Sequence, residues 1–215
     1  VATAAVFGMN FSWQGQSCGS LSRLLLHEDI HDAVVEKVVE KVAAMRMGDP
    51  LSDETDVGPV NSEIHMKRIL SHCEEANADG ARRLLGGGRP EGAEFRKGYW
   101  VEPTIYADVS PDLRLWRNEV FGPVMAIGRW SEFDEAVRLA NSTDYGLTGA
   151  IWTNDITNAM RMARKVRSGH MWINGSSLHF LGVPFGGMKS SGVGREEGRE
   201  ELYSYTEAKT INIMV

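Results

Sequence analysis

The chain has 215 residues, 42% hydrophobic and 24% charged, which is typical of a folded globular protein. Its 23 Lys and Arg against 29 Asp and Glu give a net charge of −6, so we expect neither nucleic acid nor an anionic membrane as a partner. No apolar segment approaches the length of a membrane span. The two cysteines, Cys18 and Cys73, form no CxxC pair, which favours a reducing, cytoplasmic setting.

The opening run, VATAAVFGMNFSW, has the pattern of the middle of a structural element and not that of a charged-then-apolar signal peptide. We therefore expect these residues to be a piece of a longer protein.

Periodic apolar positions predict two helices in the first third of the chain. We expect Asp29 to cap the first helix, which would end near GDP at 48–50. The second would run from about Ser62 to Ala76 and stop at the turn NADG. Their inward-facing residues would be Ile30, Val34, Val38, Val42 and Met45 in the first helix, and Met66, Ile69, Leu70 and Cys73 in the second. After a turn-rich loop, residues 98–109 are predicted to be extended, with an interruption at Pro103.

The next part of the chain alternates between strand and helix patterns. Ser131 and Asp134 would form a capping box for the first intervening helix, and Asn154 or Asp155 would cap the second. Short links between such elements imply right-handed crossovers and a parallel sheet, so we predict an α/β fold with a mostly parallel open sheet flanked by helices. The predicted strands are PVMAIGRW (123–130), GAIWT (149–153) and HMWIN (170–174).

The C-terminal run YTEAKTINIMV (205–215) alternates as an isolated strand with no later strand to pair with. The unpaired backbone groups of an edge strand are a template for pairing with another chain. We therefore predict a projecting C-terminal strand that pairs with a second copy of this chain.

Two patterns resemble ligand-binding motifs but lack an essential part. HEDIH (27–31) has the HExxH spacing of zinc proteases, which requires both histidines on one helix. If Asp29 is the helix cap, the first histidine lies outside the helix, and no third ligand candidate follows, so we predict no metal. GGMKSS (186–191) has methionine where a phosphate-binding loop needs glycine, and GVGREEG (192–198) has the wrong glycine spacing for a dinucleotide fingerprint. We interpret both as tight turns.

Cys18 lies in WQGQSCGSLS (13–22), among small and polar residues, whereas a buried structural thiol usually has aliphatic neighbours. Gly15 and Gly19 allow tight turns whose backbone N–H groups can point at the atom that the sulfur attacks. Cys73 lies instead on the apolar stripe of a helix and is predicted to be a packed thiol. Residue chemistry alone leaves Cys18 open between a nucleophile and a structural cysteine.

Several segments, in this order and spacing, together resemble the aldehyde dehydrogenase superfamily. The resemblance covers essentially the whole chain but only about the C-terminal half of a family member. The segments are GQSC (15–18), similar to the nucleophile motif; GDPLSDETDVGPV (48–60); EVFGPV (119–124), similar to the cofactor-ribose motif; and MWIN (171–174) with PFGGMKSSGVGREEG (184–198), similar to the C-terminal signature.

The resemblance implies oxidation of a small-molecule aldehyde to a carboxylic acid with NAD or NADP. Cys18 would attack the aldehyde to give a thiohemiacetal, and loss of hydride to the nicotinamide would leave a thioester for water to hydrolyse. The backbone N–H of Cys18 would hold the oxyanion. Glu119 would bind the ribose hydroxyls nearest the nicotinamide, and Phe121 would pack beside that ring. Without the family, Glu119 would be interpreted as an ordinary solvated charge.

With the projecting arm, we predict a division of the chain into a catalytic domain, residues 1–200, and a C-terminal oligomerisation arm, residues 201–215. Residues between Asn174 and Phe185 would line the aldehyde tunnel, notably Leu178, His179 and Phe185. Ser20 stands where the family pattern leads us to expect alanine or glycine, a difference that bears on packing at the nucleophile.

In the family, the glycine-rich nucleotide turn, the asparagine that completes the oxyanion hole and the glutamate that activates water all precede the nucleophile. We expect them to lie outside these residues and expect the chain to be inactive alone. The alternative is a module without turnover that serves assembly or binds aldehydes covalently. A thiol hydrolase or acyltransferase is a weaker alternative, because no histidine close to Cys18 in sequence suggests a base.

Overall fold

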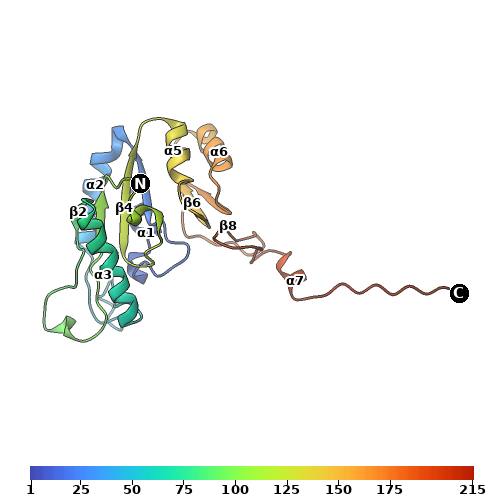
Figure 1. Cartoon of the computed structure of the whole chain (residues 1–215), viewed down its shortest axis with the longest axis horizontal. Helices are drawn as coiled ribbons and strands as arrows, with labels where there is room; N and C mark the ends of the chain where they lie inside the picture. Colours follow the sequence, from blue (N-terminus) through green and yellow to red (C-terminus); the bar gives the residue numbers. More distant parts are fainter.

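The computed structural model describes residues 1–215 and has a four-stranded sheet at its centre (Figure 1). Across this sheet the strands follow the order β1 (Arg23–His27), β4 (Val124–Trp130), β3 (Thr104–Ala107) and β2 (Arg82–Leu85). β4 runs parallel to both β1 and β3, and only β2 is antiparallel. The predicted mostly parallel sheet is therefore confirmed.

Helices cover both faces of this sheet, as its sequence requires. Parallel strands buried on both faces have continuous apolar runs, and β3 is buried along its whole length. Ile105 packs into a core with α1 (Ala2–Gly8) and α2 (Glu28–Ala43), whereas its neighbour Tyr106 packs into a core with α3 (Glu63–Ala78) and α4 (Arg114–Arg117). Alternate side chains of β4 divide between the same two cores.

Two of the three predicted helix caps are wrong and one is confirmed. His27 caps α2 in place of Asp29, because its Nδ1 accepts from the Asp29 backbone N–H at 3.3 Å. At α5 (Phe133–Ala140), the capping interaction joins the Ser131 backbone N–H to Glu135 at 3.0 Å, while Asp134 pairs with Lys165. Asp155 caps α6 (Ile156–Lys165), as predicted, and Ser62, the predicted start of α3, is the cap of that helix.

The other two strands predicted after β4 lie outside the four-stranded sheet. β6 (Thr148–Ile151) pairs in parallel with β7 (His170–Ile173) as a separate two-stranded sheet. The prediction of a single sheet for the three strands is therefore wrong for β4, although the parallel pairing of the other two is confirmed. β5 (Tyr145–Gly146) and β8 (Met188–Lys189) form a short antiparallel pair, consistent with tight turns near GGMKSS. Short 3₁₀ helices lie at Phe11–Trp13 and Glu94–Arg96.

The C-terminal arm extends away from the body of the molecule (Figure 1). After α7 (Glu201–Ser204), residues 205–215 form no strand and are exposed; Ile211 and Ile213 are 73% and 80% exposed. A β-strand is defined by hydrogen bonds to a neighbour, and the arm touches none within this chain. Its pairing with another chain stays a prediction. No helix in the structure has the length and apolar character needed to cross a membrane.

Candidate active site

A turn with two left-handed residues positions the loop that carries Cys18. The 3₁₀ helix Phe11–Trp13 ends at Gln14, with φ of 58°, and Gly15 follows with φ of +61°. A Cβ atom on Gly15 would lie 2.2 Å from the carbonyl oxygen of Gly122, so only glycine permits this approach. The nucleophile motif and the cofactor-ribose motif, predicted to act together, are therefore in direct backbone contact.

Two glutamine side chains fix the same loop to the segment that precedes α3. The Gln14 side chain is buried, and its Nε2 donates to the carbonyl oxygen of Gly58. The Gln16 Oε1 accepts from the Asn61 backbone N–H at 3.1 Å. Because both bonds end on backbone atoms, the loop is held by the course of the chain at 58–61 and not by the side chains there.

Cys18 itself is exposed, and its backbone N–H makes no hydrogen bond within the chain. The neighbouring Gly19 is held from two sides: its N–H donates to the Ser17 hydroxyl at 3.3 Å, and its carbonyl oxygen accepts from Thr148 at 3.5 Å. An ordered turn with a free N–H beside an accessible thiol has the geometry that a backbone oxyanion donor requires.

Cys73 provides the contrast within the same chain. It is fully buried on the inner face of α3, and burial raises the pKa of its thiol to about 11. A thiol with so high a pKa is almost entirely protonated at neutral pH and is a poor nucleophile. The prediction that Cys73 is a packed thiol is confirmed.

Glu119 and Phe121 lie together on the rim of a cavity of about 440 Å³. Partial burial raises the pKa of the Glu119 carboxyl above its ordinary value, and the positive charge of Arg68 opposes this shift. Phe121 has a φ of 56°, unusual for a bulky residue, and such backbone strain is common at functional sites. His65 Nε2 lies 2.7 Å from the Phe121 carbonyl oxygen, which can only accept, so the ring nitrogen donates and holds this conformation.

His65 and Arg68 are cavity residues that no sequence pattern indicates. Both belong to α3 and line the cavity beside Glu119. Their spacing of three residues puts them on one face of the helix, but in sequence they are ordinary polar positions opposite its apolar stripe. Only the packing of α3 beside residues 119–122 reveals them.

The three predicted substrate residues lie in a different part of the site. Phe185 is buried and His179 packs against it, with ring centroids 4.6 Å apart. His179 Nδ1 also lies 2.8 Å from a carboxylate oxygen of Glu197. Leu178 is exposed, and its carbonyl oxygen accepts from the Trp172 indole at 2.8 Å. A second, larger cavity of about 920 Å³ is lined by both Cys18 and Glu119. None of the three predicted substrate residues lines that cavity, so their contact with substrate stays a prediction.

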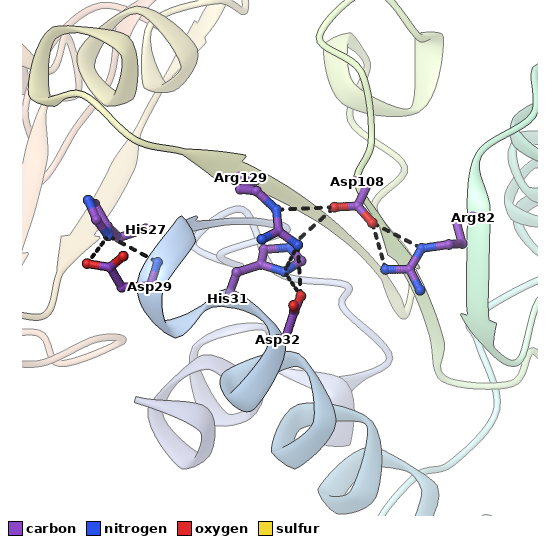
Figure 2. A network of polar contacts seen from close by, with 7 residues as sticks. All are labelled: His27, Asp29, His31, Asp32, Arg82, Asp108 and Arg129. Atoms are coloured by element: carbon purple, nitrogen blue, oxygen red, sulfur yellow. Dashed lines mark hydrogen bonds and ion pairs between the residues drawn. The ribbon is translucent and has the colours of Figure 1, made fainter.

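The two histidines of HEDIH point in different directions (Figure 2). His27 caps α2 from outside the helix, while His31 lies buried on its inner face. Around His31, Asp32 Oδ1 and Arg129 Nη2 lie 2.7 and 2.8 Å from Nδ1, and an Asp108 oxygen lies 3.5 Å from Nε2. The ring is thus part of an ion-pair network that joins α2 to the ends of β3 and β4. In the structure, no group of three or more His, Cys, Asp or Glu side chains is arranged so that it could hold a metal ion.

Comparisons with known proteins point to one family for the whole chain. The sequence pattern of the aldehyde dehydrogenase family matches residues 1–211. The chain is 47% identical over 210 residues to aldehyde dehydrogenase tropH of Talaromyces stipitatus, covering 96% of this chain and 41% of that protein. It is 41% identical to a peroxisomal aminoaldehyde dehydrogenase of Pisum sativum, covering 98% and 41%.

Solved structures show the same likeness. HpcC from Thermus thermophilus superposes with a TM-score of 0.94 at 38% identity, covering 98% of this chain and 41% of that one. Betaine aldehyde dehydrogenase from Staphylococcus aureus, solved in complex with NAD+, superposes with a TM-score of 0.92 at 36% identity, covering 95% and 40%. The chain therefore spans about two fifths of the length of the relatives it matches.

Proposed function

The chain belongs to the aldehyde dehydrogenase family, and on that premise we propose that it is the nucleophile-bearing catalytic portion of an NAD(P)-dependent aldehyde dehydrogenase. One observation carries the proposal: the glycine contact that joins the Cys18 loop to the segment of Glu119 and Phe121. The reaction needs a nucleophile and a residue that binds the cofactor ribose close together. The two segments lie so close that a Cβ atom on Gly15 would be 2.2 Å from the Gly122 carbonyl oxygen.

The residues beside Glu119 fit one end of a dinucleotide. A carboxylate accepts hydrogen bonds from the vicinal hydroxyls of a ribose, and the Phe121 ring offers a flat apolar face for a nicotinamide. His65 and Arg68 supply donors at the same cavity. When bound, the nicotinamide would accept the hydride that the reaction releases. No glycine-rich turn for the pyrophosphate accompanies these groups, so this chain would hold only the nicotinamide riboside end.

The chemistry assigned to this chain is covalent catalysis by a thiolate. The Cys18 sulfur forms a bond to the aldehyde carbon, and the carbonyl π electrons move to oxygen. The free Cys18 N–H donates to that oxyanion. Collapse of the oxyanion restores the carbonyl as hydride leaves, which produces a thioester on Cys18. Attack by water then releases the carboxylic acid and returns the electron pair to sulfur.

The aldehyde itself would reach Cys18 past Leu178, His179 and Phe185, a role supported by their grouping after β7. Two relatives are named for betaine aldehyde and aminoaldehydes, so these two classes head the panel of substrates to test. The exposed C-terminal arm supports association between copies of the chain, and the two free cysteines favour a reducing, cytoplasmic setting.

The experiment is an NADH-absorbance assay with NAD and the aldehyde panel. It compares the complete polypeptide in which these residues occur with its variants Cys18→Ser and Cys73→Ser. We expect Cys18→Ser to abolish NADH production and Cys73→Ser to retain it. Equal activity in all three proteins would overturn the assignment of the nucleophile.

The same assay on the 215-residue chain separates the proposal from its alternative. An oxyanion donor contributes about 10²–10³ in rate and a general base about 10²–10⁴, and we expect further donors and the base outside this chain. Sustained, Cys18-dependent turnover by the chain alone would contradict that expectation. Inactivity of the complete polypeptide, with aldehyde still protecting Cys18 from alkylation, would favour a module that binds aldehydes covalently.

A further inference from the structure

The loop between β7 and β8 begins beside the segment that carries the nucleophile. Ser176 is buried near the start of this loop, and a Cβ atom on Gly8 would lie 3.2 Å from the Ser176 hydroxyl oxygen. The carbonyl oxygen of the same Gly8 accepts from the Leu21 N–H at 2.8 Å, shortly after Cys18 in the sequence. The loop is therefore anchored beside the segment that follows Cys18.

The other end of the loop is paired with the C-terminal signature. Phe185 and Glu196 exchange two backbone hydrogen bonds, of 2.9 and 2.7 Å. The Gly182 N–H donates to the Glu197 carbonyl oxygen at 2.9 Å, and the Glu197 N–H donates to the Glu201 carboxylate at 2.8 Å. Glu196 and Glu197 therefore hold the loop through their backbone atoms.

The side chain of Glu197 makes a further contact with this loop. Glu197 has a φ of 61°, a left-handed conformation that glycine adopts most readily. Non-glycine residues in this region are uncommon and cluster at binding and catalytic sites. The Glu197 carboxylate reaches His179, whose Nδ1 lies 2.8 Å from Oε1. A glycine would relieve the backbone here but would leave His179 without that partner.

Glu197 determines which nitrogen of the His179 ring carries the proton. An ionised carboxylate can only accept, so the Nδ1 atom that faces it carries hydrogen. A neutral imidazole has a single N–H, which leaves Nε2 with a free lone pair. His179 makes no second hydrogen bond within the chain, and its side chain is 44% exposed. The Nε2 atom is therefore available to a ligand as an acceptor.

Neighbouring rings hold the imidazole in one orientation. The Phe185 ring packs against it with centroids 4.6 Å apart, and the His170 ring is stacked nearly parallel to it at 6.3 Å. Glu197 is the carboxylate within ion-pair distance of the His179 ring, and its negative charge disfavours an anion beside Nε2. The ligand group that fits this oriented acceptor is a neutral or cationic donor, that is, a hydroxyl or an ammonium group.

We propose that His179, held by Glu197, selects aldehydes that carry a hydroxyl or ammonium donor on the chain attached to the aldehyde carbon. Glu197 is the positioning residue, because it acts through the His179 ring. This inference rests on the function proposed above and adds a substrate class to it. The two classes that head the substrate panel differ in this respect, since an aminoaldehyde has N–H donors and the trimethylammonium group of betaine aldehyde has none.

Matched substrates measure this selection in the complete polypeptide in which these residues occur. β-Hydroxypropanal and β-aminopropanal are each compared with butanal, and γ-hydroxybutanal is compared with pentanal, so that both members of a pair have the same number of heavy atoms. One hydrogen bond predicts a kcat/KM roughly three- to tenfold higher for the donor-bearing member of at least one pair, mainly through a lower KM.

Variants show whether the selection depends on the two residues. We expect Glu197→Leu and His179→Phe each to reduce the kcat/KM ratio to about one, and the combined variant to match His179→Phe alone. Glu197→Gln keeps most of the ratio, since its amide oxygen also accepts from the Nδ1–H. Glu201→Leu is the matched control, because it removes a carboxylate that bonds to the Glu197 backbone, and it keeps the ratio. A merely structural role would change kcat/KM alike for both members of a pair.

The tautomer of His179 gives a readout that needs no activity. Long-range proton–nitrogen NMR correlation distinguishes the two ring nitrogens in the 215-residue chain at alkaline pH, where imidazole rings are neutral. His179→Phe identifies the signal by removing it. We expect the Nδ1–H form to predominate in the unmodified chain and in Glu197→Gln, and to lose its predominance in Glu197→Leu.

The two experiments separate this inference from the function on which it rests. An Nε2–H ring in the unmodified chain would overturn the inference whether or not the protein is active. A ratio near one for every pair in an active complete polypeptide would also overturn it. So would a preference for aldehydes with a terminal carboxylate, which requires a donor at Nε2. Failure of the complete polypeptide to oxidise any aldehyde would contradict the proposed function, and this selection with it.

Discussion

Replacing Gly15 with alanine tests the contact that joins the nucleophile loop to residues 119–122. Gly15 has a left-handed φ of +61°, and that conformation costs an L-residue about 1–2 kcal/mol. The new Cβ would also lie 2.2 Å from the Gly122 carbonyl oxygen, and overpacking typically costs about 1–3 kcal/mol. Together these effects predict a loss of roughly 2–5 kcal/mol in the free energy of unfolding.

Gly80→Ala is the matched control. Gly80 has a φ of +81° at the end of α3, but a Cβ there would meet nothing within 4 Å. It shares the backbone strain of Gly15 without the clash, so its expected cost is about 1–2 kcal/mol. Urea denaturation measures both variants, and the rate of Cys18 alkylation reports whether the loop has moved. Equal losses in the two variants would refute the close approach of Gly15 to Gly122.

Three further outcomes are expected. Limiting iodoacetamide modifies Cys18 before Cys73, as mass spectrometry of the adducts would show. The reason is that Cys18 is exposed, whereas Cys73 is buried and its thiol pKa is raised to about 11. Preferential labelling of Cys73 would count against the assigned nucleophile. Deletion of residues 207–215 lowers the oligomeric state of the complete polypeptide in light scattering, and an unchanged mass would exclude pairing through the arm. Affinity for NAD, measured by titration, falls as pH drops through a midpoint above the ordinary glutamate value. This is because burial raises the pKa of Glu119 and only its carboxylate accepts from both ribose hydroxyls; Glu119→Gln would remove that pH dependence.

Local sequence patterns predicted the elements whose stability is largely local or whose apolar run is long. β4, α3 and α6 follow the periodicity and caps visible in the sequence. β2 was not predicted, because Arg82–Leu85 leads directly into a glycine run that reads as a loop. Its strand character comes from antiparallel pairing with β3, about twenty residues later in the chain.

The division of the sheet was the fold feature least accessible to the sequence. The alternation of strands and helices from β4 to β7 correctly indicates crossovers, but it does not say that adjacent strands in the series are adjacent in space. β1 pairs with β4 across about a hundred residues, and β6 pairs with β7 in a separate two-stranded sheet. The order of elements along the chain therefore does not determine which strands become neighbours in a sheet.

The site shows the same limit for a different reason: its segments are joined mainly through backbone atoms. Gln14 donates to the Gly58 carbonyl, His65 to the Phe121 carbonyl and Thr148 to the Gly19 carbonyl. A carbonyl acceptor places no requirement on the side chain of its own residue, so such contacts leave no paired signature in the sequence. The exception is Gly15, where the absence of a side chain is itself the requirement. The requirement for Gly15 in the Cys18 loop could therefore be recognised from sequence, whereas His65 and Arg68 beside the Glu119 carboxylate required the packing of α3.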